Sequence, residues 1–379
     1  MTMAADKQDK VLNVPTLRFP EYSDKWLECE LQDIADLSKG AGISKDQLSE
    51  TGESCILYGE LYTKYKSEVI SNVVSKTDIE STNLVRSKAN DVIIPSSGET
   101  AIDISTARCV PYDNILLGGD LNIIRLKNQD GRFFSYQLNG VRKLDIAQIA
   151  QGVSVVHLYG ESLKRLKVRY PSKSEQEKIS SLLFVLDERI ETQNRIIEKL
   201  KSLMKGLAEN FTAFTPNTKI ADCLNCHSSV LLENQVKSEG YYKVYGANGI
   251  CGYSDSPAIL EDAILIVKDG SGVGNVSYAS GEYSVIGTSN YLTAKSGYSL
   301  KYLYFCLMIF NFVPYRTGMA IPHIYFKDYG KALIPCPSLN RQKQIATLLS
   351  KIECKIETEK TITESYLQQK RFLLQSMFI

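Results

Sequence analysis

The feature that most constrains this chain is an internal repeat. Residues 152–198 and 318–364 align at a constant offset of 166 residues without a gap, and 14 of the 47 aligned positions are identical. The identities ahead of each predicted helix include Gly152, His157, Tyr159 and Pro171, matched by Gly318, His323, Tyr325 and Pro337. Self-similarity at a fixed period is the signature of a duplicated architecture, so we expect two copies of one structural plan.

Each copy contains a long amphipathic helix. Apolar residues recur at alternating steps of four and three, which predicts a coiled-coil seam over residues 174–211 and again over 340–378. Ser174 with Glu177 predicts a capped start for the first helix. At ~1.5 Å per residue this helix would be a rod of roughly 57 Å. The predicted seam residues are Ile179, Leu183, Leu186, Ile190, Ile197, Leu200, Ile345, Leu349, Ile352 and Ile356.

Length and composition predict two globular domains besides the helices. A chain of 379 residues with 44% hydrophobic content can bury two cores. We divide it into a disordered leader (1–14), a first domain (15–160), a lead-in with the central helix (161–215), a second domain (216–325), and a lead-in with the second helix (326–379). There is no signal-peptide pattern and no run of 18 apolar residues, so we expect a cytoplasmic protein without membrane contact.

Charge does not by itself indicate a nucleic-acid-binding protein. The net charge is +1, and residues 15–160 hold 15 basic against 20 acidic side chains. Residues 215–325 are also slightly acidic, with 7 against 8, whereas the helical parts are basic. Any claim that the domains bind nucleic acid must therefore rest on other features.

Both halves show the same order of predicted elements. In the first, residues 31–37 predict a short amphipathic turn, 91–95 and 121–126 predict strands, and 133–151 predicts a helix. In the second half the matching segments are 220–226, 262–267, 288–292 and 300–312. A duplicated chain with similar helices and dissimilar domains offers two different binding surfaces on one scaffold.

Several motifs resemble those of a known family. They are the run VPTLRFP at 14–20 with Trp26 and the Leu-x-Asp-Ile pattern at 31–34, the turn-rich VYGANGICGY at 244–253, and the prolines that lead into glutamine-containing helices. Together with the repeat, they resemble the specificity subunit of bacterial type I restriction-modification systems from about Val14 to Ile379.

The resemblance implies a fold class and a function. It implies an α+β, internally duplicated fold, in which two globular target-recognition domains are separated by two long antiparallel coiled-coil helices. Each domain would read one half of a bipartite site in double-stranded DNA, and the helices would set the spacing, which a rod of this length limits to roughly 15 base pairs. Two methyltransferase subunits would dock on the chain, and restriction subunits that translocate DNA would join through them.

The same resemblance assigns the chemistry to those partners. We expect the chain to be a non-catalytic subunit of an endodeoxyribonuclease and adenine-N6 methyltransferase complex, with no cofactor or metal of its own. The partners would use S-adenosylmethionine, and ATP and Mg²⁺ for restriction. Consistent with this, the sequence shows no Asn-Pro-Pro-Tyr type loop, no G-x-x-x-x-G-K-[ST] phosphate loop and no nuclease motif.

Candidate DNA contacts follow from residue chemistry. Base edges are read by Arg, Lys, Asn, Gln, Ser or Thr on loops, and phosphates are bound by cations or by backbone amides in glycine turns. For each candidate the alternative is an ordinary solvated loop. The candidates are Lys64, Lys66, Ser96, Ser97, Thr100 and Gln151 in the first domain and Asn248, Lys268, Ser271, Asn275 and Arg316 in the second.

Three other motifs have simpler explanations. Cys223-x-x-Cys226-His227 matches a haem-attachment pattern, but the two cysteines align with the apolar Ile34 and Leu37, so we expect them to face a core. The glycines at 270–274 have the spacing of a tight hairpin turn and not of a dinucleotide loop. The paired histidines are structural or contact DNA at the end of each domain.

One alternative remains open at this stage. A duplicated coiled-coil scaffold could bind protein partners through both domains without any DNA. A seam of apolar residues more often serves simple helix packing than a specific function.

Overall fold

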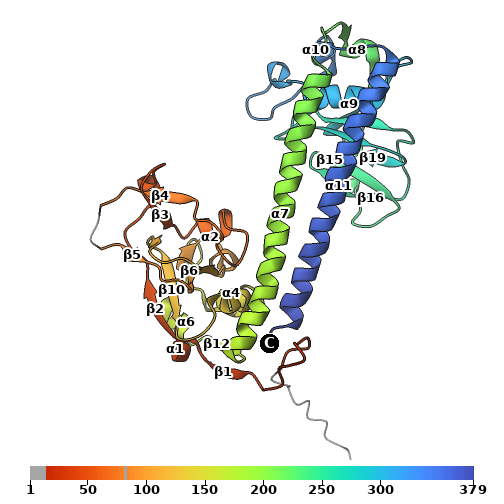
Figure 1. Cartoon of the computed structure of the whole chain (residues 1–379). Coiled ribbons are helices and arrows are strands. Elements are labelled where there is room, and N and C mark those ends of the chain that lie inside the picture. The colour runs from red at the N-terminus through yellow and green to blue at the C-terminus, as the bar shows by residue number, and fades with distance from the viewer. Residues whose placement is uncertain (1–13, 81–82) are drawn as a thin grey trace, which may run out of the picture. The chain divides into compact units, whose positions relative to one another are not determined.

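The computed structural model describes residues 14–80 and 83–379, so most of the leader predicted at 1–14 lies outside the described residues. The chain forms two compact units (Figure 1): residues 1–193 with 362–379 in unit 1, and 194–361 in unit 2. Both long helices contribute to both units: α7 (Lys173–Phe211) and α11 (Leu339–Ser376). The described helices include none that is long and apolar enough to cross a membrane.

Unit 1 contains the first globular domain. Its central sheet has the strand order β2-β10-β6-β8, and a second sheet has the order β4-β3-β9-β5. Its remaining elements are short helices and strand pairs. In chain order the elements are β1 (Leu27–Glu30), α1 (Leu31–Ile34), β2 (Ala35–Lys39), η1 (Lys45–Gln47), β3 (Glu53–Ile56), α2 (Glu60–Thr63), β4 (Ser75–Thr77), β5 (Val85–Arg86), β6 (Asp91–Pro95), β7 (Ser97–Gly98), α3 (Ala101–Ile104), β8 (Arg108–Val110), β9 (Leu116–Leu117), β10 (Leu121–Leu126), α4 (Gly131–Asn139), α5 (Lys143–Ile149), β11 (Val156–His157), α6 (Gly160–Lys164) and β12 (Lys167–Tyr170).

Unit 2 repeats the central sheet and changes the second one. Its central sheet β14-β20-β17-β18 corresponds strand by strand to that of unit 1, whereas the second sheet, β16-β15-β19, has three strands instead of four. The elements are β13 (Thr218–Lys219), α8 (Ile220–Cys223), β14 (Leu224–Ser228), η2 (Glu233–Gln235), β15 (Tyr242–Gly246), β16 (Gly249–Ser254), β17 (Ala263–Val267), β18 (Val276–Ala279), β19 (Tyr283–Val285), β20 (Ser289–Ala294), α9 (Leu300–Met308), η3 (Val313–Tyr315), α10 (Phe326–Tyr329) and β21 (Leu333–Ile334).

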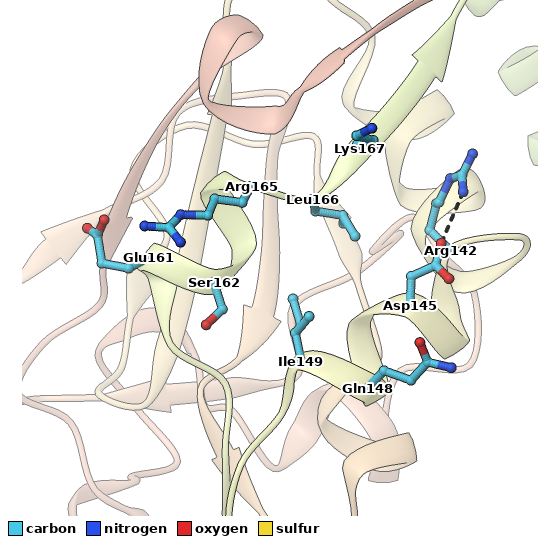
Figure 2. A pocket seen from close by; sticks show the side chains of 9 residues that line it. All are labelled: Arg142, Asp145, Gln148, Ile149, Glu161, Ser162, Arg165, Leu166 and Lys167. Carbon is cyan, nitrogen blue, oxygen red and sulfur yellow. Dashed lines mark hydrogen bonds and ion pairs between the residues drawn. The ribbon is translucent and has the colours of Figure 1, made fainter.

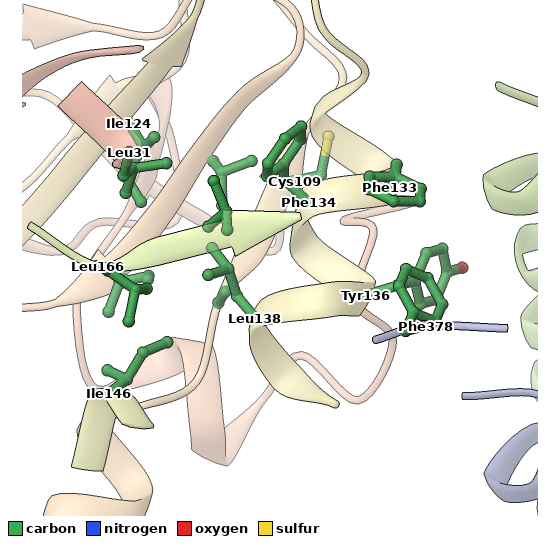
Figure 3. Packing of buried hydrophobic residues seen from close by; sticks show 14 of the residues in the cluster. Leu31, Cys109, Ile124, Phe133, Phe134, Tyr136, Leu138, Ile146, Leu166 and Phe378 are labelled. Atoms are coloured by element: carbon green, nitrogen blue, oxygen red, sulfur yellow. The ribbon is translucent and has the colours of Figure 1, made fainter. Parts of the chain in front are cut away.

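The core of unit 1 joins the domain to both long helices. Trp26, Phe133 and Phe134 are buried together with Ile179 and Leu183 of α7. The end of α11 completes this core, because Phe378 packs its ring 5.1 Å from that of Phe133 (Figure 3). The first half of α7 therefore packs beside the last turns of α11 in this unit, which makes the two helices antiparallel there.

The core of unit 2 has the same plan. The end of α7, through Ala208, and the start of α11, through Ile345 and Leu349, pack against the aromatic helix α9. Of the predicted seam residues, Ile179, Leu183, Leu186, Ile197, Ile345, Leu349 and Ile356 are buried, and Ile190, Leu200 and Ile352 are half-buried.

A buried glutamine fixes each domain to the start of its helix. Gln176 accepts a hydrogen bond from the backbone N–H of Asp130, the N-cap of α4, at 3.0 Å and donates to the carbonyl of Pro171 at 2.9 Å. Its repeat partner Gln342 accepts from the N–H of Ser299, the N-cap of α9, at 2.9 Å and donates to the carbonyl of Pro337 at 2.8 Å. The proline and glutamine of each repeat thus form one structural unit.

A second repeated contact lies three helical turns further along. Asp187 of α7 accepts a hydrogen bond from the hydroxyl of Tyr136 in α4 at 2.8 Å and pairs with Lys370 of α11 at 2.5 Å. Its repeat partner Glu353 of α11 accepts from the hydroxyl of Tyr304 in α9 at 2.9 Å. An acidic residue at the same repeat position therefore binds a domain tyrosine in both units.

Four local expectations were wrong. Residues 35–39 form strand β2, because pairing with β10 outweighs the helical pattern of 31–37. The helix expected at 133–151 is broken at Gly140, which caps α4, and resumes as α5. Helix α7 begins at Lys173, so Ser174 lies inside its first turn and is not the cap. The helix expected at 300–312 also ends early, at Met308.

We predict that Gln176→Ala and Gln342→Ala each destabilise their own unit. Removing the side-chain amide leaves a backbone N–H and a carbonyl without their partner. The free energy of unfolding should fall by about 1–3 kcal/mol for each group that water cannot reach. Urea unfolding should show it: Trp26, the single tryptophan, reports unit 1 by fluorescence, and far-UV circular dichroism reports both units.

The exposed Gln368 of α11 is the matched control, and Gln368→Ala should change the free energy of unfolding by less than about 0.5 kcal/mol. A Gln176→Ala variant that unfolds with the wild-type midpoint would rule out the structural role given to this glutamine.

Candidate functional site

In the first domain, three of the six predicted contact residues come together around His157. Strand β7 pairs Ser97 with His157, and the backbone N–H of Leu158 donates to the carbonyl of Ser96 at 2.9 Å. Gln151 and His157 exchange two backbone hydrogen bonds at 2.9 and 2.7 Å. Ser96 and Ser97 are buried, so the structure places them behind this loop, whereas Gln151 is exposed.

Of the other three residues of the first domain, Thr100 lies near this group in sequence, and Lys64 and Lys66 follow α2. Thr100 caps α3, two residues beyond β7, and its hydroxyl accepts from the N–H of Asp103 at 3.1 Å. Lys64 is held by the buried Glu60 at 2.6 Å, which neutralises its charge. Lys66 is exposed and donates to the carbonyl of Thr63 at 3.3 Å, so it is the more available cation of the two.

In the second domain the predicted residues gather around the glycine turn between β17 and β18. These strands pair antiparallel, which confirms the interpretation of residues 268–275 as a hairpin turn. A cavity of about 270 Å³ beside the turn is lined by Ser271 and by Asn248 of the β15–β16 turn. Arg316 donates to the carbonyl of Val273 at 2.8 Å, and Lys268 and Asn275 are the first and last residues of the turn.

Each domain carries one copy of a loop that we call the glycine–histidine loop, residues 151–157 and 317–323. In the second copy Thr317 and His323 exchange backbone hydrogen bonds at 2.9 and 2.7 Å, the same distances as in the first. Gly152 and Gly318 have φ of 123° and 86°, a region that other residues rarely adopt. A Cβ at these glycines would lie 2.1 and 2.4 Å from the carbonyl oxygens of Val155 and Ile321, so the tight loop requires glycine.

The histidines that close these loops have different partners. Both stack on the tyrosine two residues later, with ring centroids 6.1 Å apart for His157–Tyr159 and 6.4 Å for His323–Tyr325. The Nδ1 atom of His323 also lies 2.7 Å from a carboxylate oxygen of Asp269, an acidic neighbour that the sequence did not reveal. In the first domain Ser97 occupies the corresponding strand position beside His157.

The cysteine motif belongs to the core, as expected. Cys223 is fully buried and Cys226 packs against the same apolar cluster. Contact with Cys336 and burial raise the pKa of the Cys223 thiol, and burial raises that of Cys226 to about 11, so both are thiols and not thiolates at neutral pH. His227 bonds to the hydroxyl of Thr293 at 3.0 Å. Among the described residues, no group of three or more His, Cys, Asp or Glu side chains is placed to hold a metal.

A separate pocket of about 640 Å³ lies in unit 1 between α5, α6 and the start of β12 (Figure 2). Its lining includes Arg142, which pairs with Asp145 at 3.0 Å, and both Arg165 and Glu161. Charges of both signs favour neither an anion nor a cation there, and none of the predicted contact residues lines this pocket.

The repeat, the domain fold and the loops together match a known family. The family model described as the type I restriction modification DNA specificity domain matches residues 23–202 and again residues 219–365. The chain belongs to this family. Its two matched regions coincide with the two copies of the repeated plan, each ending within a long helix.

Named relatives of this specificity-domain protein are similar over part of the chain. A Mycoplasma genitalium protein named as a type I specificity subunit is 28% identical over 178 residues, 42% of this chain and 46% of the relative. The specificity subunit of the Escherichia coli type I restriction enzyme EcoprrI is 26% identical over 118 residues, 31% of this chain and 29% of the relative. The matches thus span less than half the length of these curated relatives.

Solved structures confirm the predicted fold class over nearly the whole chain. The S subunit of a type I restriction-modification system from M. genitalium superposes with a TM-score of 0.68 at 19% identity, covering 97% of this chain and 99% of that one. A chain from a structural study of complex assembly and conformational transition in a type I system superposes with a TM-score of 0.53 at 14% identity, covering 93% and 97%.

We predict that Lys66→Ala and Arg316→Ala weaken the binding of the assembled complex to DNA of any sequence. Each removes a cation that can neutralise a phosphate, so affinity should fall severalfold and the slope of log K against log salt should decrease by about 1 per charge. Fluorescence anisotropy across a salt series measures both quantities.

Lys331→Ala removes an exposed cation from the lead-in to α11 and serves as the control, with no change in slope expected. Unchanged slopes for Lys66→Ala and Arg316→Ala would exclude these two residues as phosphate contacts.

Proposed function

We propose that this chain is the DNA sequence-recognition subunit of a type I restriction-modification complex. Each globular domain reads one half of a bipartite site in double-stranded DNA, and α7 with α11 sets the separation of the halves. The proposal is carried by one observation: two domains with the same central sheet differ in the loops and in the second sheet.

The candidate contacts for sequence readout differ between the two domains. The first offers Thr100 and Gln151 near β7 and Lys66 after α2, and the second offers Arg316, Asn248 and Ser271 around a glycine turn. Different donors and acceptors select different bases, so two half-sites of different sequence are expected. The contacts that hold domain to helix, through Gln176 and Gln342, are the same in both.

The chemistry in this proposal belongs to the partners. Two methyltransferase subunits dock on the chain and use S-adenosylmethionine for adenine-N6 methylation, and restriction subunits that join through them use ATP and Mg²⁺. The complex acts in the cytoplasm. The nearly neutral domains bind phosphates weakly by themselves, so the partners supply much of the attraction to DNA.

We expect N6-methyladenine to appear at one bipartite motif in cells that express this chain with the methyltransferase subunit of its own system. Cells that express the methyltransferase alone are the control and should lack the motif. Sequencing that detects modified bases reads the target directly. An active complex whose methylation does not depend on this chain would favour the protein-binding scaffold instead.

We also expect the two half-sites to be separable. Exchanging residues 216–325 for the second domain of another specificity subunit should change one half of the methylated motif and leave the other half and the spacing unchanged. Exchanging residues 15–160 is the reciprocal control and should change the other half only. A change in both halves after one exchange would contradict the assignment of one domain to each half-site.

A further inference from the structure

The tips of the two glycine–histidine loops expose apolar side chains at equivalent repeat positions. Val153 is 97% exposed and its repeat partner Met319 is 105% exposed. Val155 and its partner Ile321 follow at 52% and 58%. Two valines, a methionine and an isoleucine held in water on short loops are unfavourable unless something covers them, because each fully buried apolar side chain of this size stabilises a complex by roughly 1.5–3 kcal/mol.

The loops are built to hold these tips outward. Each is closed by a pair of backbone hydrogen bonds, contains a glycine in the left-handed region, and rests on a histidine stacked against a half-exposed tyrosine. A short loop closed in this way loses little conformational freedom on binding, which favours association. Because both domains build the loop in the same way, chance does not explain why its apolar tip is exposed in each.

The similarity of the two loops restricts what they bind. The surfaces that read DNA sequence differ between the domains, whereas the loop sequences QGVSVVH and TGMAIPH keep the glycine, the histidine and two apolar tips. A loop that is the same on both domains contacts something that is the same at both half-sites. Two candidates meet this condition: two copies of one protein subunit, or the DNA backbone.

The chemistry of the tips favours the protein. Residues 151–160 contain no lysine or arginine, so the first loop offers no cation to a phosphate. Aliphatic tips beside a tyrosine are the composition of a protein interface, in which methionine and tyrosine are enriched.

We propose that the two glycine–histidine loops are docking sites for two copies of one methyltransferase subunit, each of which receives a loop tip in an apolar pocket. The inference rests on the proposed function and adds to it the residues that hold the partner. The position suits the chemistry, because the predicted DNA contacts lie at the base of each loop, Gln151 as the first residue of one and Arg316 directly before the other. An enzyme that extrudes a base must sit beside the half-site it modifies.

Serine substitutions at the tips test the proposal without disturbing a core. We would prepare Val153→Ser with Val155→Ser, Met319→Ser with Ile321→Ser, and all four together. Leu144→Ser in the first domain and Val230→Ser in the second remove exposed apolar side chains elsewhere, at 65% and 91% exposure, and are the matched controls. Thermal unfolding by circular dichroism should be unchanged in all five variants.

Assembly with the purified methyltransferase subunit of the same system, without DNA, is measured by native mass spectrometry and titration calorimetry. Each double variant, which changes one loop, should weaken the binding of one methyltransferase copy at least tenfold, so that complexes with a single copy accumulate. The fourfold variant should lose both copies, and the controls should assemble as the wild type does. Wild-type affinity in the fourfold variant would overturn the proposal.

Two further outcomes separate this inference from the function itself. If assembly is unchanged but the complex loses affinity for DNA, the tips are apolar wedges in the minor groove, and protein docking is refuted. If the loop variants lose methyltransferase while the wild-type complex methylates DNA without a bipartite motif, the docking sites stand and the proposed recognition function fails.

Discussion

The buried amide of one glutamine in each repeat is the interaction on which the rest of the structure depends. Gln176 and Gln342 each join a proline carbonyl at the start of a long helix to the backbone N–H of the residue that caps the domain helix, α4 or α9. The backbone N–H at the start of the domain helix and the proline carbonyl have few other partners, so the glutamine amide satisfies both at once. Each domain is thereby fixed to its helix by the same bond.

This arrangement separates a constant frame from a variable surface. The glutamine, the acidic residue that binds a domain tyrosine, and the central sheet are the same in both units. The second sheet and the turns beyond it differ in strand number and in polar residues. Sequence recognition can therefore change without altering the attachment of domain to helix. The glycine–histidine loops stand at the start of the repeated segment and are alike in both domains, unlike the second sheets.

The sequence predicted the regular parts of the fold and few of the contacts at the site. Helices α7 and α11 and strands β6, β10, β17 and β20 were predictable because their apolar patterns run over many residues and tertiary contacts reinforce them. Residues 35–39 became strand β2 because β10 supplied partners that a local pattern does not show. The candidate contacts of the second domain were identified by residue type, but their gathering around one turn depends on β15, β17 and the loop before α10 meeting in space.

The sequence by itself determined the duplication, the two long helices with their apolar seams and the family, because periodicity and identity at a fixed offset need no partner to be recognised. The tertiary structure decided which residues are available to a ligand. Ser96 and Ser97 became buried supports, Lys64 was neutralised by Glu60, and Val153 and Met319 stood exposed at the loop tips. Exposure is a property of what lies beside a residue in space, and the pairings of His157 with Ser97 and of His323 with Asp269 join segments far apart in the chain.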